Sequence, residues 1–151
     1  MPLNCSDLAI SHGADSAPFS ELHSLSDSFH RAAASNSDRG IVFIEDEGED
    51  FLSYADLKVE AERTLHGLRK LGLEPGTPVI FQFQRNRDFF IAFWGCVLGG
   101  FVPAPMATPP SYEQDNGALL RLKNVWRLLG RPPVFTDCQN APSSNNCRGA
   151  W

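Results

Sequence analysis

The sequence has little of what marks a small metal-bound or disulfide-bonded domain, with four cysteines and four histidines in 151 residues. The cysteines, Cys5, Cys96, Cys138 and Cys147, form no CxxC pair, and none stands at zinc-ligand spacing from a histidine. This spacing argues against a zinc finger and predicts no disulfide framework. A chain of this kind is expected in the reducing cytoplasm.

An excess of positive charge and a membrane-length apolar run are also missing. The formal net charge is -5, with basic residues scattered among acidic ones, so a nucleic-acid partner is not expected. The main apolar run, residues 89–102, is shorter than the ~20 residues that span a bilayer, and Pro103 follows it directly. The first residues lack the basic start and apolar core of a secretory signal. We therefore expect no membrane span and a cytoplasmic protein.

The chain does contain alternating strand and helix patterns. Strands are expected at residues 41–44, 79–84, 101–103 and 133–136, with a short partner strand at 51–52, and helices at 22–34, 53–71, 87–98 and 115–130. Such alternation is typical of α/β proteins. We predict a partial doubly wound parallel sheet with flanking helices.

Two helix starts carry capping signals. Ser53 and Asp56 have the spacing of a capping box, with aspartate in place of the usual glutamate or glutamine. Asn86 is the expected N-cap of the apolar helix that follows it. Both helices should then bury an apolar face against the sheet or against each other.

The residues that could carry chemistry are better explained as structural ones. The acidic stretch 45–50 lacks the ligand spacing of a calcium loop and is expected to be a solvated turn. Cys96 lies in an apolar run, His66 on a polar helix side, and the pair 99–100 at a helix end without a neighbouring Ser, Thr or Lys. Trp94 and Trp126 lie on apolar helix faces, where core packing is expected. No catalytic, cofactor-binding or metal-binding residue is predicted.

Three stretches resemble conserved segments of one known superfamily. They are the helix entry LSYADL at 52–57, the segment GTPV at 76–79 with Asn86 and Phe90 after it, and the helix–strand turn at 92–103. In this order and spacing they are similar to the start of the large N-terminal domain of adenylate-forming (AMP-binding) synthetases and ligases. The proline-rich loop and the helix at 115–130 look most like fatty acyl-AMP ligases and the adenylation or loading domains of nonribosomal peptide synthetases.

The resemblance implies a function for complete relatives. They activate a carboxylic acid with ATP and magnesium to an acyl-adenylate, release pyrophosphate, and transfer the acyl group to a CoA or carrier-protein thiol. The family's phosphate loop ending in Pro-Lys, its adenine and ribose segments and its catalytic lysine have no counterpart here and would lie further downstream. This chain is therefore expected to be an N-terminal fragment without activity of its own.

The domain limits follow from the same patterns. Residues 1–20 are expected to be an irregular lead-in, residues 21–137 the N-terminal part of an AMP-dependent synthetase/ligase domain, and residues 138–151 an unstructured tail. The alternative is an interaction module, an incomplete α/β domain that associates with a complementary ligase fragment through an open sheet edge. A third possibility is an unrelated small α/β binding domain.

Overall fold

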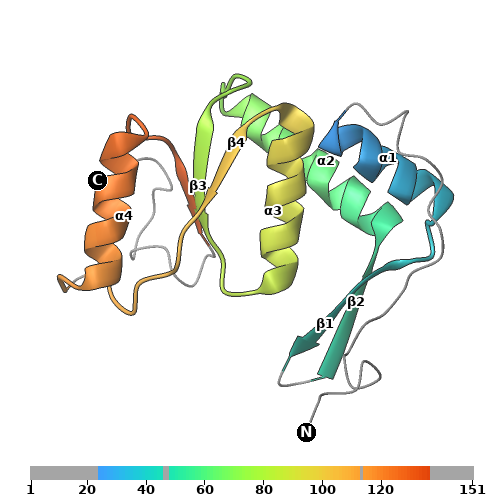
Figure 1. Ribbon diagram of the computed structural model, residues 1–151, viewed down its shortest axis with the longest axis horizontal. Coiled ribbons are helices and arrows are strands. Elements are labelled where there is room, and N and C mark those ends of the chain that lie inside the picture. The colour runs from blue at the N-terminus through green and yellow to red at the C-terminus, as the bar shows by residue number, and fades with distance from the viewer. Residues whose placement is uncertain (1–23, 46–47, 113, 137–151) are drawn as a thin grey trace, which may run out of the picture.

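The computed structural model describes residues 24–45, 48–112 and 114–136, which form a small parallel sheet with helices on both sides and a separate hairpin (Figure 1). Helix α1 (Leu25–Ser35) leads into the antiparallel hairpin of β1 (Gly40–Glu45) and β2 (Gly48–Ser53). Helix α2 (Tyr54–Lys70) starts directly after β2. The predictions about residues 1–20 and 138–151 fall outside the described part of the chain.

The parallel sheet has three strands in the order β4-β3-β5. Strand β3 (Pro78–Gln82) is central, with β4 (Val102–Pro105) on one side and β5 (Val134–Thr136) on the other. Helix α3 (Asn86–Gly99) connects β3 to β4, and helix α4 (Gly117–Leu128) connects β4 to β5. This alternation of strand and helix confirms the predicted α/β class.

The two faces of β3 are covered by different helices. Val79 and Phe81 face a cluster with Leu68 of α2 and Cys96 of α3, whereas Ile80 packs with Leu119 and Leu122 of α4. Figure 1 shows the sheet lying between α4 on one side and α2 and α3 on the other. Because β3 is covered on both faces, its residues 79–82 are all buried, and its alternating sequence does not produce an exposed side.

Helices α2 and α3 approach closely because small residues line their interface. A Cβ atom added at Gly95 of α3 would lie 2.8 Å from Cγ2 of Thr64 on α2, closer than a real contact allows. Trp94 stacks on Phe29 of α1 with ring centroids 4.1 Å apart, which fixes α1 to the same group of helices. The predicted core role of Trp94 is confirmed.

The structure corrects two details of the sequence prediction. The hairpin strands do not join the parallel sheet but form a two-stranded sheet of their own. Asn86 is the first residue of α3 rather than its N-cap, and the N-cap residue Arg85 makes no capping hydrogen bond with its side chain. By contrast, the Ser53 hydroxyl accepts a bond from the Asp56 N–H at 3.0 Å, so the predicted cap of α2 is confirmed.

Candidate functional site

The carboxyl ends of the parallel strands are where α/β proteins usually bind ligands, and here a buried glutamine occupies that position. Gln82, at the end of β3, is 1% exposed. Its Nε2 donates to the Ala107 carbonyl oxygen at 2.7 Å, and its Oε1 accepts from the Tyr112 hydroxyl at 3.1 Å. Because both ends of the amide are bonded, Gln82 ties the proline-rich loop to the sheet rather than offering a site to a ligand.

Thr136 lies beside Gln82 at the same end of the sheet. The two residues are paired in the β3–β5 register, and Oγ1 of Thr136 is buried without a hydrogen-bond partner among the described residues. Sequence reasoning did not single out either residue. A single buried polar residue at the end of a strand does not change the hydrophobic periodicity of the sequence. The pairing of Gln82 with Thr136 is therefore known only from the register of the sheet.

The two outer edges of the sheet differ in their capacity to bind another strand. The Val102 N–H donates to the Thr77 carbonyl, and the Met106 N–H donates to the Phe81 carbonyl. The backbone polar groups of every second residue along β4 therefore point toward β3. Pro103 and Pro105 therefore face the outer edge, where proline has no N–H to donate. The edge of β4 is blocked, and the alternating prolines of the sequence could have indicated this.

The outer edge of β5 carries no such block. The Pro133 carbonyl accepts a hydrogen bond from the Ile80 N–H at 3.1 Å. The backbone polar groups of Pro133 and Phe135 therefore point toward β3, and those of the alternate residues point to the outer edge. These are Val134 and Thr136, and their N–H and C=O groups point to the open edge. Within the described residues, no strand pairs with this edge.

A hollow of about 410 Å³ lies beside β5 on the α2–α3 side of the sheet. Its walls come from α2, α3 and two strands, with Leu68, Phe81, Ala92, Cys96 and Phe135 among the lining residues. Burial raises the pKa of the Cys96 thiol to about 11, so it stays protonated at neutral pH and behaves as an apolar core residue. The predicted buried role of Cys96 is confirmed.

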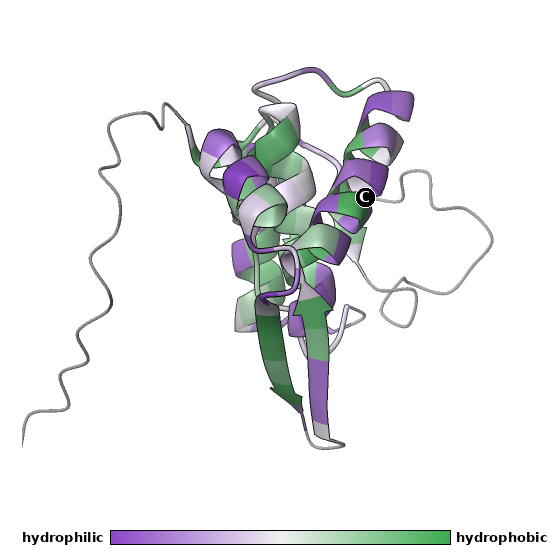
Figure 2. Ribbon diagram, turned by 90° about the vertical axis from the view of Figure 1, so that its right-hand side faces the viewer, coloured by the Kyte–Doolittle hydropathy of each residue, from purple (hydrophilic) through white to green (hydrophobic). Residues whose placement is uncertain are grey.

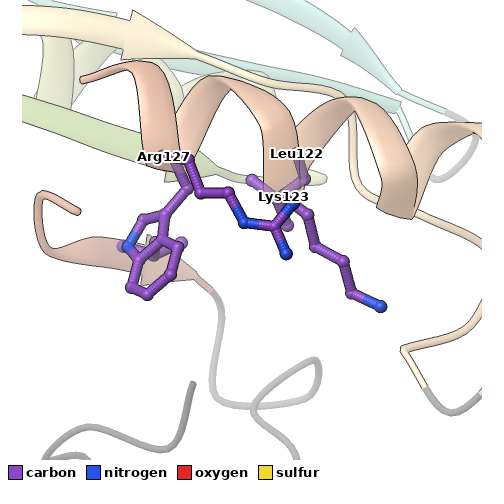
Figure 3. Close-up of a pocket in the computed structure, with 5 residues that line it drawn as sticks. Leu122, Lys123 and Arg127 are labelled. Carbon is purple, nitrogen blue, oxygen red and sulfur yellow. The ribbon is translucent and has the colours of Figure 1, made fainter. Parts of the chain in front are cut away.

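A second, smaller hollow of about 150 Å³ lies beside β5 on the α4 side. It is lined by Leu122, Trp126 and Val134, and by the basic side chains Lys123 and Arg127. Figure 3 shows Lys123 and Arg127 extending from α4 beside this hollow. The indole N–H of Trp126 donates to the Pro132 carbonyl at 2.9 Å, which anchors the ring at the start of β5.

The glycine pair 99–100 does not fit the phosphates of ATP. A Cβ atom at Gly99 would lie 2.3 Å from the ring of Phe101, so this glycine allows the chain to turn tightly onto β4. Gly100 has φ 69° and caps α3, and its N–H is bonded to Val97. A phosphate cradle needs several free N–H groups converging on one point, which this turn does not provide.

The charged and histidine residues form no metal centre in the described part of the chain. No three His, Cys, Asp or Glu side chains gather there at metal-binding distance. Asp50 of the hairpin is instead paired with Arg87 of α3 at 3.0 Å, and with Arg85 at 3.9 Å. These pairs connect the hairpin to the start of α3. None of the described helices combines the length and the apolar character that crossing a bilayer requires.

Comparison with known proteins gives the family. The family model of the AMP-binding enzymes matches residues 29–115, which run from α1 to the loop before α4. The chain belongs to the AMP-binding enzyme family. The resemblance at the three sequence stretches is thereby confirmed.

Individual relatives extend this assignment. A Caulobacter vibrioides protein, named provisionally as an acyl-CoA synthetase, is 30% identical over 109 residues, which are 72% of this chain and 19% of the relative. The solved adenylation domain of a keto acid-selecting NRPS module, bound to keto acyl adenylate, is 42% identical with a TM-score of 0.71, covering 77% of this chain and 22% of that one. A fatty acid AMP ligase from Legionella pneumophila shares the fold, with 23% identity and a TM-score of 0.71 over 80% of this chain and 21% of that one.

The chain thus spans about a fifth of the length of these relatives. The matched part of the AMP-binding enzyme fold consists of the helices α1 to α4, the hairpin and the three-stranded parallel sheet. Four fifths of each relative lie beyond the matched region. Activity, substrate and partners are therefore considered as proposals.

Proposed function

We propose that this chain supplies the N-terminal scaffold of an adenylate-forming ligase domain. In the complete domain, a carboxylate oxygen attacks the α-phosphorus of ATP, pyrophosphate leaves, and a mixed anhydride of the acid with AMP forms. A CoA or carrier-protein thiol then attacks the acyl carbon, and AMP leaves. The observation that carries the proposal is the 42% identity with a solved adenylation domain over 77% of this chain.

The same relative favours a class of substrate. Identity with the NRPS adenylation domain is 42%, compared with 23% for the fatty acid AMP ligase. We therefore place the carboxylic acid in the amino acid or keto acid class used by peptide synthetase modules. We also propose that the domain extends over residues 21–137. The cytoplasmic location stays a prediction.

The chain contributes no catalytic, ATP-binding or magnesium-binding residue in this proposal. The bonded Gly100 N–H group and the fully bonded Gln82 amide support this view. ATP and magnesium would be held by the rest of the domain. The described residues would then act by supporting one side of the substrate cleft.

Pyrophosphate exchange provides the test. The purified 151-residue chain should incorporate labelled pyrophosphate into ATP no faster than a blank, with any amino or keto acid. A chimera, in which residues 1–136 replace the matching segment of the keto acid-selecting adenylation domain, should exchange with that domain's acid. Exchange by the chain alone, or a folded but inactive chimera, would contradict the proposal.

A second candidate function is an interaction module that associates with a separate ligase fragment. The open edge of β5, between two hollows, favours this candidate. The two functions are compatible, because the scaffold role requires the same surface to meet the rest of the domain. They differ in whether the contact forms between separate chains.

A further inference from the structure

We infer that this chain associates with further copies of itself head to tail, with the hairpin of one copy lying on helix α4 of the next. The hairpin face consists of Val42, Ile44, Glu49 and Phe51, and the helix face is the outer side of α4. Both surfaces expose apolar side chains, and the two carry opposite charges. The contact does not depend on the proposed scaffold function.

The hairpin face combines apolar side chains with a negative charge. Val42, Ile44 and Phe51 are exposed, and Ile44 is the most exposed of the three. Cross-strand partners share one face of a hairpin, and the register pairs Val42 with Phe51 and Ile44 with Glu49. Glu49 is exposed as well, so its carboxylate lies beside this apolar patch. Apolar residues that gather on one exposed face indicate an interaction surface.

The outer side of α4 combines apolar side chains with positive charge. Leu120 and Leu128 are both exposed, and their spacing places them on the same side of the helix. Arg121 and Arg127 flank this pair of leucines on its two sides, and both arginines are exposed. Neither arginine has an ion-pair partner within residues 24–45, 48–112 and 114–136. Although the chain has a net charge of -5, α4 itself contains no acidic residue.

The charges determine which of these surfaces can meet. Two hairpin faces in contact would bring carboxylates together, and two α4 faces would bring arginines together, so like-charge repulsion disfavours both arrangements. A hairpin face on an α4 face instead places Glu49 against Arg121 or Arg127. The exposed apolar side chains of both surfaces are then removed from water, which supplies most of the stabilisation, while the charges fix the orientation.

The two surfaces cannot meet within one molecule. Figure 1 shows the hairpin and α4 at opposite ends of the structure, with the parallel sheet and α3 between them. The contact therefore requires a second copy of the chain. Because each copy contributes one surface of each kind, the contact is heterologous, and every added copy leaves one hairpin face and one α4 face available at the ends. The copies should form a series whose mean mass rises with concentration.

Ile44→Lys and Leu128→Glu each disable one of the two surfaces. The two residues are 82% and 84% exposed, so the folded chain loses little packing in either variant. Lysine at position 44 would face the arginines of α4, and glutamate at position 128 would face Glu49. Val59→Lys and Leu71→Glu are the matched controls, because both residues are exposed on α2 or at its end. Leu71 is the C-cap of α2 and Leu128 the last residue of α4, so both glutamates meet a similar helix end.

Sedimentation velocity of the purified 151-residue chain measures the association. The wild type and the two control variants should show a mean mass that rises with concentration. Ile44→Lys and Leu128→Glu should each weaken association at least about tenfold. A mixture of these two variants should restore association but stop at a dimer, because each variant keeps only the surface that the other lacks. Circular dichroism shows whether each variant is folded, and the charge-reversed pair Glu49→Lys and Arg127→Glu replaces one that is not.

Several outcomes would overturn the inference. A wild type that stays monomeric at every concentration would leave a different protein as the occupant of both faces. A wild type that stops at a dimer would indicate a contact between like surfaces, and equal association of all variants would place the contact elsewhere. A mixture of Ile44→Lys and Leu128→Glu that stays monomeric would show that the hairpin and α4 do not bind each other. None of these results alters the pyrophosphate exchange of the chimera, which tests the scaffold function separately.

Discussion

At the residue scale, Gly95 determines how closely α2 and α3 can pack. Its missing Cβ atom would lie 2.8 Å from Thr64 Cγ2 and 3.1 Å from the Ala61 carbonyl oxygen. Thr64 is β-branched and held on a helix, and Ala61 presents its backbone, so neither group can move away easily. This explains a glycine in the middle of an apolar helix, where alanine would otherwise be preferred.

We expect Gly95→Ala to lower the free energy of unfolding by ~1–3 kcal/mol, because overpacking outweighs the gain in helix propensity. Gly67→Ala is the control, since its Cβ atom enters open space, and it should raise that free energy by ~0.5–1 kcal/mol. Urea unfolding of both variants measures the two values. Equal changes of the same sign in the free energy of unfolding would show that the close packing of α2 and α3 does not depend on Gly95.

At the scale of the element, the starts of α2 and α3 provide a comparison of two helix caps. Ser53 accepts a hydrogen bond from Asp56 N–H, and its hydroxyl donates to Asp56 Oδ2 at 2.6 Å. Arg85 occupies the same position before α3 but makes no capping bond. The α3 helix depends instead on the packing of its apolar side chains, of which Ala92 and Cys96 are buried.

Ser53→Ala should therefore lower the free energy of unfolding by ~1 kcal/mol, since it leaves an N–H group of the first turn without its acceptor. Arg85→Ala should change it by less than ~0.5 kcal/mol, because Arg85 loses only an exposed ion pair with Asp50. Thermal and urea unfolding at neutral pH measure both changes. A larger loss in Arg85→Ala than in Ser53→Ala would contradict the assignment of the caps.

At the scale of the whole molecule, the strands differ in how many other elements pair with them or pack against them. Strand β3 is paired on both sides and covered on both faces. The hairpin extends away from the helices (Figure 2). The face that carries Val42, Ile44 and Phe51 is exposed although these residues are apolar. Ile44 on that face is 82% exposed, whereas Phe43 on the opposite face is 4% exposed.

Hydrogen exchange should follow this difference. We expect the amides of β3 to exchange slowest, close to the rate set by global unfolding. The amides at the turn end of the hairpin, residues 44–45 and 48–49, should exchange at least about tenfold faster. Mass spectrometry of the exchanged and digested chain gives the rates, with the urea-unfolded chain as the reference. Protection of the hairpin equal to that of β3 would show that the whole chain opens as one unit.

The amino-acid sequence alone was sufficient for the α/β class, the main elements and the family, because these depend on local periodicity, capping residues and motif spacing. The LSYADL helix entry and the GTPV strand are examples, since each is a contiguous pattern. Asn86 shows the limit of such local reasoning, because the chain continues the helix through it and Arg85 takes the cap position.

The tertiary structure decided which of these elements are neighbours, and therefore where a functional surface lies. Gln82 and Thr136 are 54 positions apart and meet through the register of β3 and β5. The open edge of β5 and the hollows on its two sides depend on strand order, which no local pattern encodes. Backbone groups pair across long separations, so the edge that is left to bind another chain is known only once the sheet has formed.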